Sequence, residues 1–472
     1  MRFPPVETDS VSPSEGGENK GNPSFVPPLI GEENEIQTPL KEVEVKEGEE
    51  IVVLSFISME KDYIALIIFA FTYLLIAARR FRLLHIGRSA GALVGATLMV
   101  VFGVISIDGA YKTIDLSTII LLFGMMVISE YLRLAGFFRG VATLFIRNIS
   151  SPKNFLTAVV WISGIGSAFL VNDTVCIMMT PIILAYTISA EVDALPFLIA
   201  LATSSNIGSI GTLAGNPQNM LIGSYAHLSY SKYFIVIFPL AVFLLYLNNF
   251  LLNKVFEKHL ESGKGGIPQI PEFRIKKNLM AKSGFVLFLV VLFWFLGFHL
   301  SFTALCGASV LILIARISPQ RVFSKIDLSI LLFFGGLFVV IGAMEKTRVF
   351  DYFEPFVPND FTFSGSLLFS FITVIFSNFF SNVPFVMVAL KWASKASSSE
   401  YFYYLLAVIS TLAGNLTLVG SMANLIVVEM AKGTRIVGFR EYFKYGLLIT
   451  FISCLISVLY LYLISRFILS NF

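Results

Sequence analysis

The sequence has few charged residues and few of the side chains that build disulfides or metal sites. Only 14% of its 472 residues are charged, whereas a soluble domain usually carries about a quarter. It has three cysteines, all inside apolar runs, and four histidines without metal-ligand spacing. The N-terminus lacks the basic start, apolar run and cleavage site of a signal peptide. We therefore expect neither an enzyme, nor a metal or cofactor protein, nor a nucleic-acid partner.

Apolar residues dominate instead. The chain is 56% hydrophobic with a mean hydropathy of +0.80. Runs of membrane-spanning length recur from Tyr63 to the C-terminus, which predicts an all-α, polytopic protein of the cell membrane. Its immediate partner is the lipid bilayer. We predict ten spans, at residues 63–79, 89–107, 114–134, 195–227, 231–253, 283–299, 301–316, 326–345, 401–431 and 445–468.

The N-terminal segment differs from the rest of the chain. Residues 1–50 hold twelve acidic and four basic side chains, although the whole chain has a net charge of +3. The segment is rich in Glu, Pro, Gly and Ser and cannot build an apolar core, so we expect residues 1–58 to be disordered. Met59 lies directly before the first span and is an alternative start of the chain, in which case the acidic tail is absent.

Two long apolar stretches are not ordinary spans. One lies at 155–190 and contains a single charge, Asp173; the other begins at residue 361 and has no charge up to residue 390. A single spanning helix needs about 20 residues, and two full crossings with a turn need more than about 40. Each stretch is better interpreted as a re-entrant hairpin of two shorter helices, at 155–190 and 361–398.

A polar motif occurs once in each hairpin. The first copy reads Ser167-Ala168-Phe169-Leu170-Val171-Asn172-Asp173-Thr174, and the second reads Ser377-Asn378-Phe379-Phe380-Ser381-Asn382-Val383-Pro384. A later span in each half also carries a break of glycine and asparagine, at 206–219 and 415–424. Matched polar breaks in two halves of an apolar chain are typical of the binding site of a secondary transporter.

The basic residues predict the membrane orientation. Lys and Arg gather in groups at 79–88, 133–153, 254–282, 316–325 and 432–444, and such groups favour the cytoplasmic side. If all five groups are cytoplasmic, the two hairpins enter from opposite sides. We therefore expect an inverted repeat, with its first copy at 59–253, a cytoplasmic linker at 254–281 and its second copy at 282–472. The tetrapeptide Ile-Asp-Leu-Ser occurs at 114–117 and 326–329 and extends this repeat.

The candidate binding residues lie at the tips and breaks. A broken helix offers carbonyls to a cation and N–H groups to an anion or a hydroxyl, and amide and hydroxyl side chains add neutral partners. Plain helix packing through small residues is the alternative. The predicted substrate or ion ligands are Asn172, Asp173, Thr174, Asn206, Gly208, Gly215, Asn216, Asn219, Ser381, Asn382, Pro384, Asn415, Thr417, Gly420, Ser421 and Asn424.

Asp173 is the residue we expect to couple transport to an ion. An ionisable group inside an apolar stretch is costly and is functional by default. Asp173 could take up a proton or ligate a cation; as an alternative, it could cap the helix that follows it. For Glu130 with Arg133, at i and i+3, and for Glu345 we expect structural or interfacial roles.

These motifs resemble the ion transporter superfamily. The resemblance rests on Val171-Asn172-Asp173-Thr174, Asn206-Ile207-Gly208, Gly215-Asn216-Pro217-Gln218-Asn219 and Ser381-Asn382-Val383-Pro384. It covers residues 63–472 and is nearest to the arsenite and silicic-acid efflux branch. Dicarboxylate symporters of this superfamily carry Ser-Asn-Thr at both tips, and this chain does not. The resemblance implies a scaffold domain and a transport domain that moves as an elevator, often in a homodimer.

Three transport functions follow. The leading one is proton-coupled efflux of a small inorganic hydroxide or anion such as arsenite or silicic acid. The second is sodium-coupled symport of a di- or tricarboxylate or another anion, and the third is sodium/proton antiport. The coupling ion is therefore H⁺ or Na⁺, and no other cofactor is expected. A receptor or scaffold that transports nothing would leave the doubled polar breaks unexplained.

Overall fold

A computed structural model of the chain describes residues 47–78, 87–137, 140–141, 151–261, 275–352, 357–358, 360–395 and 399–467. The chain divides into two units, Met1–Val53 and Leu54–Phe472. Of the first unit, only the start of one helix lies among the described residues. All contacts below belong to the second unit, and every described element in it is helical. The predicted acidic tail lies outside the described residues up to residue 46, and so does the middle of the predicted linker, at 262–274.

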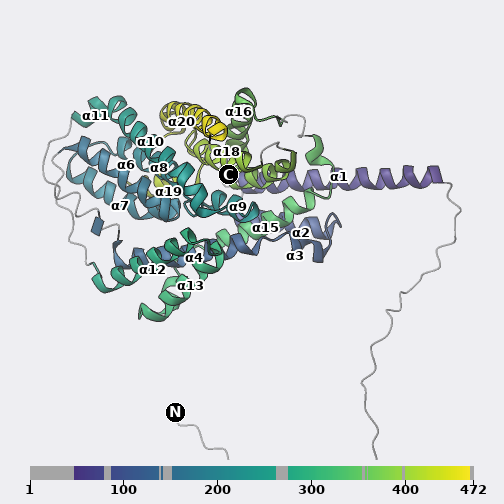
Figure 1. Ribbon diagram of the computed structural model, residues 1–472, viewed down its shortest axis with the longest axis horizontal. Helices are drawn as coiled ribbons and strands as arrows, with labels where there is room; N and C mark the ends of the chain where they lie inside the picture. The colour runs from purple at the N-terminus through teal and green to yellow at the C-terminus, as the bar shows by residue number, and fades with distance from the viewer. Residues whose placement is uncertain are drawn as a thin grey trace, which may run out of the picture. The chain divides into compact units, whose positions relative to one another are not determined.

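The described helices can be followed along the chain in Figure 1. They are α1 (Glu47–Ala78), α2 (Arg88–Val101), α3 (Ile107–Thr113), α4 (Leu116–Ala135), α6 (Pro152–Phe169), α7 (Asn172–Ser189), α8 (Leu195–Ser209), α9 (Pro217–Tyr225), α10 (Tyr230–Val255), α11 (Glu257–Glu261), α12 (Lys277–Phe295), α13 (Leu300–Ile314), α14 (Pro319–Phe323), α15 (Ser329–Met344), α16 (Phe363–Phe380), α17 (Asn382–Ala389), α18 (Ser399–Ala413), α19 (Met422–Ala431) and α20 (Phe439–Phe467), with 3₁₀ turns η1 (Val349–Tyr352) and η3 (Leu390–Lys395).

The first helix corrects one prediction. Residues 47–58 were expected to be disordered, but they form the start of α1, which begins at Glu47 rather than near residue 63. The run Ile51-Val52-Val53-Leu54 accounts for the difference, because it adds apolar, helix-compatible residues upstream of the charged Glu60-Lys61-Asp62 that marked the predicted boundary. The short helices α3, α11 and α14 were not predicted either, since they contain only five to seven residues each.

Several helices are long and apolar enough to cross a membrane. Within the described residues these are α4, α10, α12, α16 and α20, and seven further apolar helices have 10–17 residues. A helix of 15 residues is about 22 Å long, shorter than the roughly 30 Å hydrocarbon core of a bilayer. Ten full crossings therefore stay a prediction, whereas a polytopic helical membrane protein is what these helices form.

Both predicted hairpins are pairs of helices. In the first, α6 and α7 are separated by Leu170 and Val171, and Phe155 near the start of α6 stacks on Tyr186 near the end of α7, with ring centroids 3.6 Å apart. The two helices therefore run antiparallel. In the second, Ser381 alone separates α16 from α17, with a left-handed φ of 78°. The predicted end of this hairpin at 396–398 lies outside the described residues.

Helix contacts divide the second unit into two groups (Figure 1). The first helix group contains α2, α3, α4, α12, α13 and α15, and the second contains α6–α10 and α16–α20. Closely packed pairs of helices hold each group together. A Cβ on Gly336 of α15 would lie 2.7 Å from the backbone carbon of Ala92 in α2, so these two helices approach at backbone contact. The two groups meet where α4 contacts α7 and α9, where α12 contacts α10 and where α15 contacts α17.

The contact between α6 and α8 gives a prediction on stability. A Cβ on Gly208 would lie 1.9 Å from the carbonyl oxygen of Gly164, so Gly208→Ala must push the two helices apart. We expect this variant to lose about 1–3 kcal/mol of stability, as overpacked sites do. The control is Gly284→Ala in α12, where an added Cβ meets nothing within 4 Å. Thermal unfolding in detergent should separate the two variants; equal melting temperatures would contradict the close α6–α8 approach.

Candidate functional site

The first hairpin tip is fixed by hydrogen bonds of Asn172. Its backbone N–H donates to the Gly215 carbonyl at 3.0 Å, and its Nδ2 donates to Asn206 Oδ1, also at 3.0 Å. Its Oδ1 accepts from the backbone N–H of Asp173 at 3.0 Å. The tip is therefore tied to the break between α8 and α9. Gly215 is required there, because a Cβ would lie 2.2 Å from the Ser209 carbonyl oxygen.

Asn206 joins the two halves of the chain. Its Nδ2 donates to Asn415 Oδ1 at 2.9 Å and to Asn424 Oδ1 at 3.1 Å, across more than 200 residues of sequence. Its Oδ1 accepts from Ser421 Oγ at 3.1 Å as well as from Asn172. Asn206 is 1% exposed, so these bonds satisfy an amide that would otherwise be buried without partners.

The two breaks are built alike. Asn219 Nδ2 donates to the carbonyls of the residues ten and seven positions earlier, Ser209 and Thr212, at 3.4 and 3.1 Å. Asn424 Nδ2 donates to carbonyls at the same two offsets, those of Gly414 and Thr417, at 2.6 and 3.0 Å. Each of these asparagines therefore holds the unwound segment before its own helix, which is a supporting role.

The matching continues across the junction of the halves and reveals a residue that the sequence analysis missed. Thr411 precedes Ser421 by ten residues, as Asn206 precedes Asn216. Thr411 Oγ1 accepts from Asn216 Nδ2 at 3.2 Å and approaches Asn219 Oδ1 at 3.4 Å. These bonds mirror those that Asn206 makes with the second break. The spacing alone would have identified Thr411, but its residue type differs from Asn206.

The second tip is less completely bonded. Asn382 is 5% exposed, and its Oδ1 has no hydrogen-bond partner within the described part of the chain. The neighbouring Asn378 holds the α18–α19 break instead, since its Oδ1 accepts from Thr417 Oγ1 at 2.8 Å and its Nδ2 donates to the Ala413 carbonyl at 2.9 Å. The Asn382 oxygen is therefore a buried acceptor at this tip that has no partner within the described residues, as is the Ser377 hydroxyl.

A cavity of about 350 Å³ lies between the two tips. We call it the tip cavity. The first residues of α7, α9, α17 and α19 all line it, so four helix N-termini converge there. Its opposite wall comes from the starts of α2 and α15. The lining includes six predicted site residues: Asn172, Asp173, Ser381, Asn382, Gly420 and Ser421. It also includes Arg88, Ser89, Gln218, Asp327 and Ser329, which the sequence analysis did not assign to the site.

The other predicted site residues lie behind or beside this lining. Gly208, Gly215, Asn206, Asn216, Asn219, Asn415, Thr417 and Asn424 support the two breaks through the contacts given above. Thr174 lies in the first turn of α7, outside the lining of the tip cavity. Pro384 lines a separate apolar cavity of about 400 Å³. The predicted site residues therefore fall into those that line the tip cavity and those that support the two breaks, with Thr174 and Pro384 in neither set.

The remaining acidic candidates form ion pairs. Glu130 accepts from Arg133 Nε and Nη2 at 2.5 and 2.6 Å, which agrees with the i, i+3 pairing expected from the sequence. Glu345, at the end of α15, pairs with Lys391 Nζ at 2.6 Å. Both carboxylates are thus held by cations outside the tip cavity. Asp173 and Asp327 are the carboxylates that line it.

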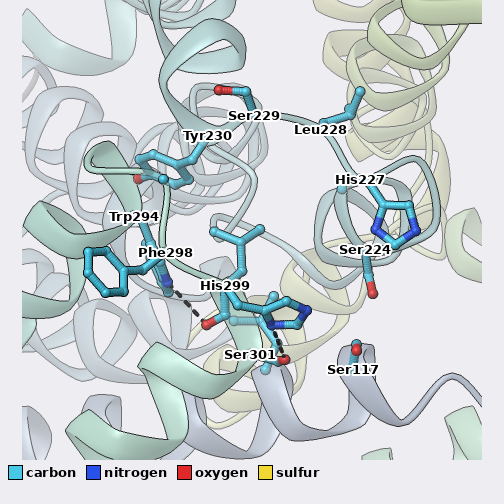
Figure 2. A pocket seen from close by; sticks show the side chains of 14 residues that line it. Ser117, Ser224, His227, Leu228, Ser229, Tyr230, Trp294, Phe298, His299 and Ser301 are labelled. Atoms are coloured by element: carbon cyan, nitrogen blue, oxygen red, sulfur yellow. Dashed lines mark hydrogen bonds between the residues drawn. The ribbon is translucent and has the colours of Figure 1, made fainter.

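Figure 2 shows a second pocket, of about 260 Å³, at the ends of α4, α9, α10, α12 and α13. His227 and His299 both line it, and His299 Nδ1 lies 3.0 Å from Ser301 Oγ. The fold thus brings together two histidines that are far apart in sequence. No predicted site residue lines this pocket. In the described parts of the chain, no three His, Cys, Asp or Glu side chains gather as a metal site would require.

A cavity lined by the tips of two helical hairpins, in a chain of apolar membrane helices, is the arrangement of a multi-pass membrane transporter. Residues 66–401 match the family described as citrate transporter, CitMHS, and the chain belongs to this family. Several curated proteins are similar along most of their length. A Dictyostelium discoideum protein named arsB is 29% identical, covering 86% of this chain and 93% of that protein. The silicon efflux transporter LSI3 of Oryza sativa subsp. japonica is 30% identical, covering 74% and 86%. A 46 kDa membrane protein of Mycobacterium leprae is 30% identical, covering 85% and 98%.

Proposed function

We propose that this transporter exports a small inorganic weak acid of the arsenite or silicic-acid type in exchange for protons. The observation that carries the proposal is the lining of the tip cavity, to which Asp173, Asn172 and Asn382 all contribute. Hydroxyl groups of a weak acid can donate to the carboxylate and to the amide oxygens, and their oxygens can accept from N–H groups. The names of two relatives, arsB and silicon efflux transporter, support the same substrate class.

The helix ends around the cavity suit oxygen-bearing substrates. Each helix N-terminus carries about half a positive charge on its unpaired N–H groups, so four of them add up to about two charges. Arg88 adds one positive charge, and Asp173 and Asp327 remove two. The cavity is therefore close to neutral or weakly positive, which favours a neutral hydroxyl compound or a small anion. A fully ionised tricarboxylate would meet two carboxylates at close range.

Asp173 explains why protons and substrate would move in opposite directions. The ionised carboxylate accepts a hydrogen bond from a substrate hydroxyl, whereas the protonated form has lost the charge that strengthens this bond. The proton and the substrate then compete for the Asp173 carboxylate. A transporter that binds one of two solutes at a time, at the same site, exchanges them across the membrane. If the substrate were an anion, protonation of Asp173 would instead favour its binding, and the two would move together. Coupling direction and substrate charge are therefore linked.

The alternative function is symport of a carboxylate with sodium ions. It is favoured by the description of the matching family as citrate transporters and by the helix N-termini, which also bind carboxylates. The two functions are separated by uptake into proteoliposomes under a proton gradient alone or a sodium gradient alone. The panel is arsenite, silicic acid, citrate and succinate. Uptake of arsenite or silicic acid driven by protons supports the proposal, and sodium-driven uptake of citrate or succinate alone contradicts it.

We also propose that the two helix groups move relative to each other as scaffold and transport domains, in an inverted repeat. The similar hydrogen bonds of the two breaks support the repeat. The tip cavity is lined by helices of both groups, so a displacement of one group relative to the other would change the access to it, which supports the proposed motion.

The repeat predicts that the open ends of the two hairpins face opposite sides of the membrane. A single cysteine at the exposed Lys153, beside the start of α6, should react with a membrane-impermeant thiol reagent added from the cytoplasm, and one at the exposed Asp360, before the start of α16, should react with reagent added from outside. The background for both is a chain with Cys176, Cys306 and Cys454 replaced by serine or alanine. Labelling of both positions from one side only would contradict the inverted repeat.

A further inference from the structure

The apolar cavity of about 400 Å³ beside the second hairpin tip has no part in the proposed transport mechanism. We call it the aromatic cavity, because its lining includes Phe69, Tyr73, Phe350, Phe376, Phe380, Phe385 and Trp392. No charged side chain is among the described residues that line it. Pockets for small molecules have volumes of about 300–1,000 Å³, so this cavity is large enough for a ligand. A cavity with apolar walls does not hold water, so its natural occupant is an apolar group.

The aromatic cavity extends along the second hairpin. Two rows of lining residues, each with a spacing of four, follow the two arms from the tip: Phe380, Phe376 and Ile372 on α16, and Pro384, Val388 and Trp392 on α17 and η3. A spacing of four places the first row on one face of α16. With a rise of 1.5 Å per residue, the eight steps of this row extend for about 12 Å. The cavity therefore has the length to take a linear apolar chain.

Helix α1 forms a further wall. Leu66, Phe69 and Tyr73 of α1 line the cavity at spacings of three and four, which is one face of a helix. Near the tip this wall touches the hairpin, since the rings of Tyr73 and Phe380 meet edge to face with centroids 5.1 Å apart. Leu66 lies seven residues before Tyr73 and is 41% exposed, and its neighbour Ile67 is 67% exposed. The cavity is thus closed beside the tip and continuous with the apolar outer surface of α1 at its other end.

A second, independent observation is a buried polar group at the end of the cavity away from the tip. Trp392 is 8% exposed, and its Nε1 has no hydrogen-bond partner within the described residues. A buried donor without a partner is destabilising, and a buried tryptophan N–H usually has one. An occupant that suits the whole cavity therefore has a linear apolar body and an oxygen acceptor at one end. Bilayer lipids, which surround this protein, have this chemistry.

We propose that the aromatic cavity binds one acyl chain of a bilayer lipid, with the end of the chain beside the second tip and an ester oxygen accepting from Trp392 Nε1. The chain would pack on Phe380 and Pro384, the residues on either side of Ser381 and Asn382. The lipid would thus be a structural partner of the tip that lines the tip cavity. The inference does not depend on which substrate is transported.

The test is quenching of Trp392 fluorescence by phosphatidylcholine with brominated acyl chains, with the full chain in vesicles of this lipid or of its unbrominated form. Trp161→Phe and Trp294→Phe leave Trp392 as the single tryptophan. We expect strong quenching although Trp392 is 8% exposed, because a chain in the cavity brings bromine close to its indole. Val388→Phe fills part of the cavity and should remove most of the quenching. The matched control is Val310→Phe, at a 44% exposed position of α13 outside the lining, which should not change it.

A second measurement needs no replacement of the other tryptophans. Mass spectrometry of the detergent-solubilised wild type should find a retained phospholipid, which Val388→Phe loses and Val310→Phe keeps. Trp392→Phe should retain less, because it removes the N–H donor and keeps an aromatic ring. Equal quenching and equal retention in Val388→Phe and Val310→Phe would overturn the site. Retention of a detergent or another apolar compound in place of phospholipid would overturn the class of ligand, and full retention in Trp392→Phe would overturn the position of the ester group.

Discussion

Asn382→Ala is expected to abolish transport while leaving the amount and melting temperature of the folded protein almost unchanged. The Asn382 oxygen makes no hydrogen bond within the described structure, so its removal costs the resting fold little. The bound substrate, by contrast, loses a partner, and a lost polar contact at a buried site costs about 1–3 kcal/mol. If the Asn382 amide also contacts the substrate during the transport motion, the loss of transport rate is larger than the loss of binding alone. Initial rates of substrate exchange in liposomes measure the effect.

Asn172→Ala should abolish transport as well, but at a visible cost in stability. Its amide bonds Asn206 at 3.0 Å, so alanine leaves the Asn206 oxygen with fewer partners in a buried network. The matched control is Asn248→Ala. Asn248 is also buried and donates to Thr203 and Ser204 at 3.0 and 2.9 Å, but it does not line the tip cavity. The Asn248→Ala variant should therefore be less stable than the wild type and should keep its transport activity. Full activity in Asn172→Ala or Asn382→Ala would remove that tip from the site.

The fold was largely predictable because membrane helices follow a strong compositional signal. The lengths of the two apolar stretches, with one charge in the first and none in the second, predicted helix pairs, and the pairs α6–α7 and α16–α17 agree with this. The prediction was weakest at α1, where an apolar run continues upstream of the acidic Met59-Glu60-Lys61-Asp62 boundary. Short helices such as α3 were missed because fewer than two turns leave no periodic pattern to detect.

The candidate site was predictable as a set of residues but not as an arrangement. Asn206 and Asn424 are the same residue type as the tip asparagines and also lie in polar breaks of apolar segments. They nevertheless lie behind the cavity and are hydrogen-bonded to each other across the two halves. No local pattern distinguishes a lining amide from a supporting one, since the difference arises from contacts between distant segments. Asp327 had a signal, because its tetrapeptide repeats that of Asp115. Arg88 had none, since it lies in a basic cluster that orients the chain.

Asp173→Asn is expected to remove proton-driven accumulation of substrate while keeping downhill exchange. Asparagine keeps the size of the side chain and its ability to accept a hydrogen bond from a hydroxyl, but it fixes the neutral state. Capping of α7 does not depend on the carboxylate. The residue before α7, Val171, makes no side-chain cap, and the Asp173 N–H is satisfied by Asn172 Oδ1. The loss of a charge near a helix N-terminus should cost only about 0.3–1 kcal/mol of stability.

The pH dependence separates this role from the alternatives. In the wild type, acidification on the substrate side protonates Asp173 and weakens substrate binding, so the KM for exchange should rise as pH falls. In Asp173→Asn the KM should not change with pH. The control is Asp108→Asn on the exposed start of α3, which should keep both accumulation and the wild-type pH profile.

If Asp173→Asn liposomes still concentrate arsenite or silicic acid under a pH difference alone, Asp173 does not carry the proton. Asp327 is then the next residue to replace, because it is the other carboxylate that lines the tip cavity, whereas Glu130 and Glu345 are held by Arg133 and Lys391.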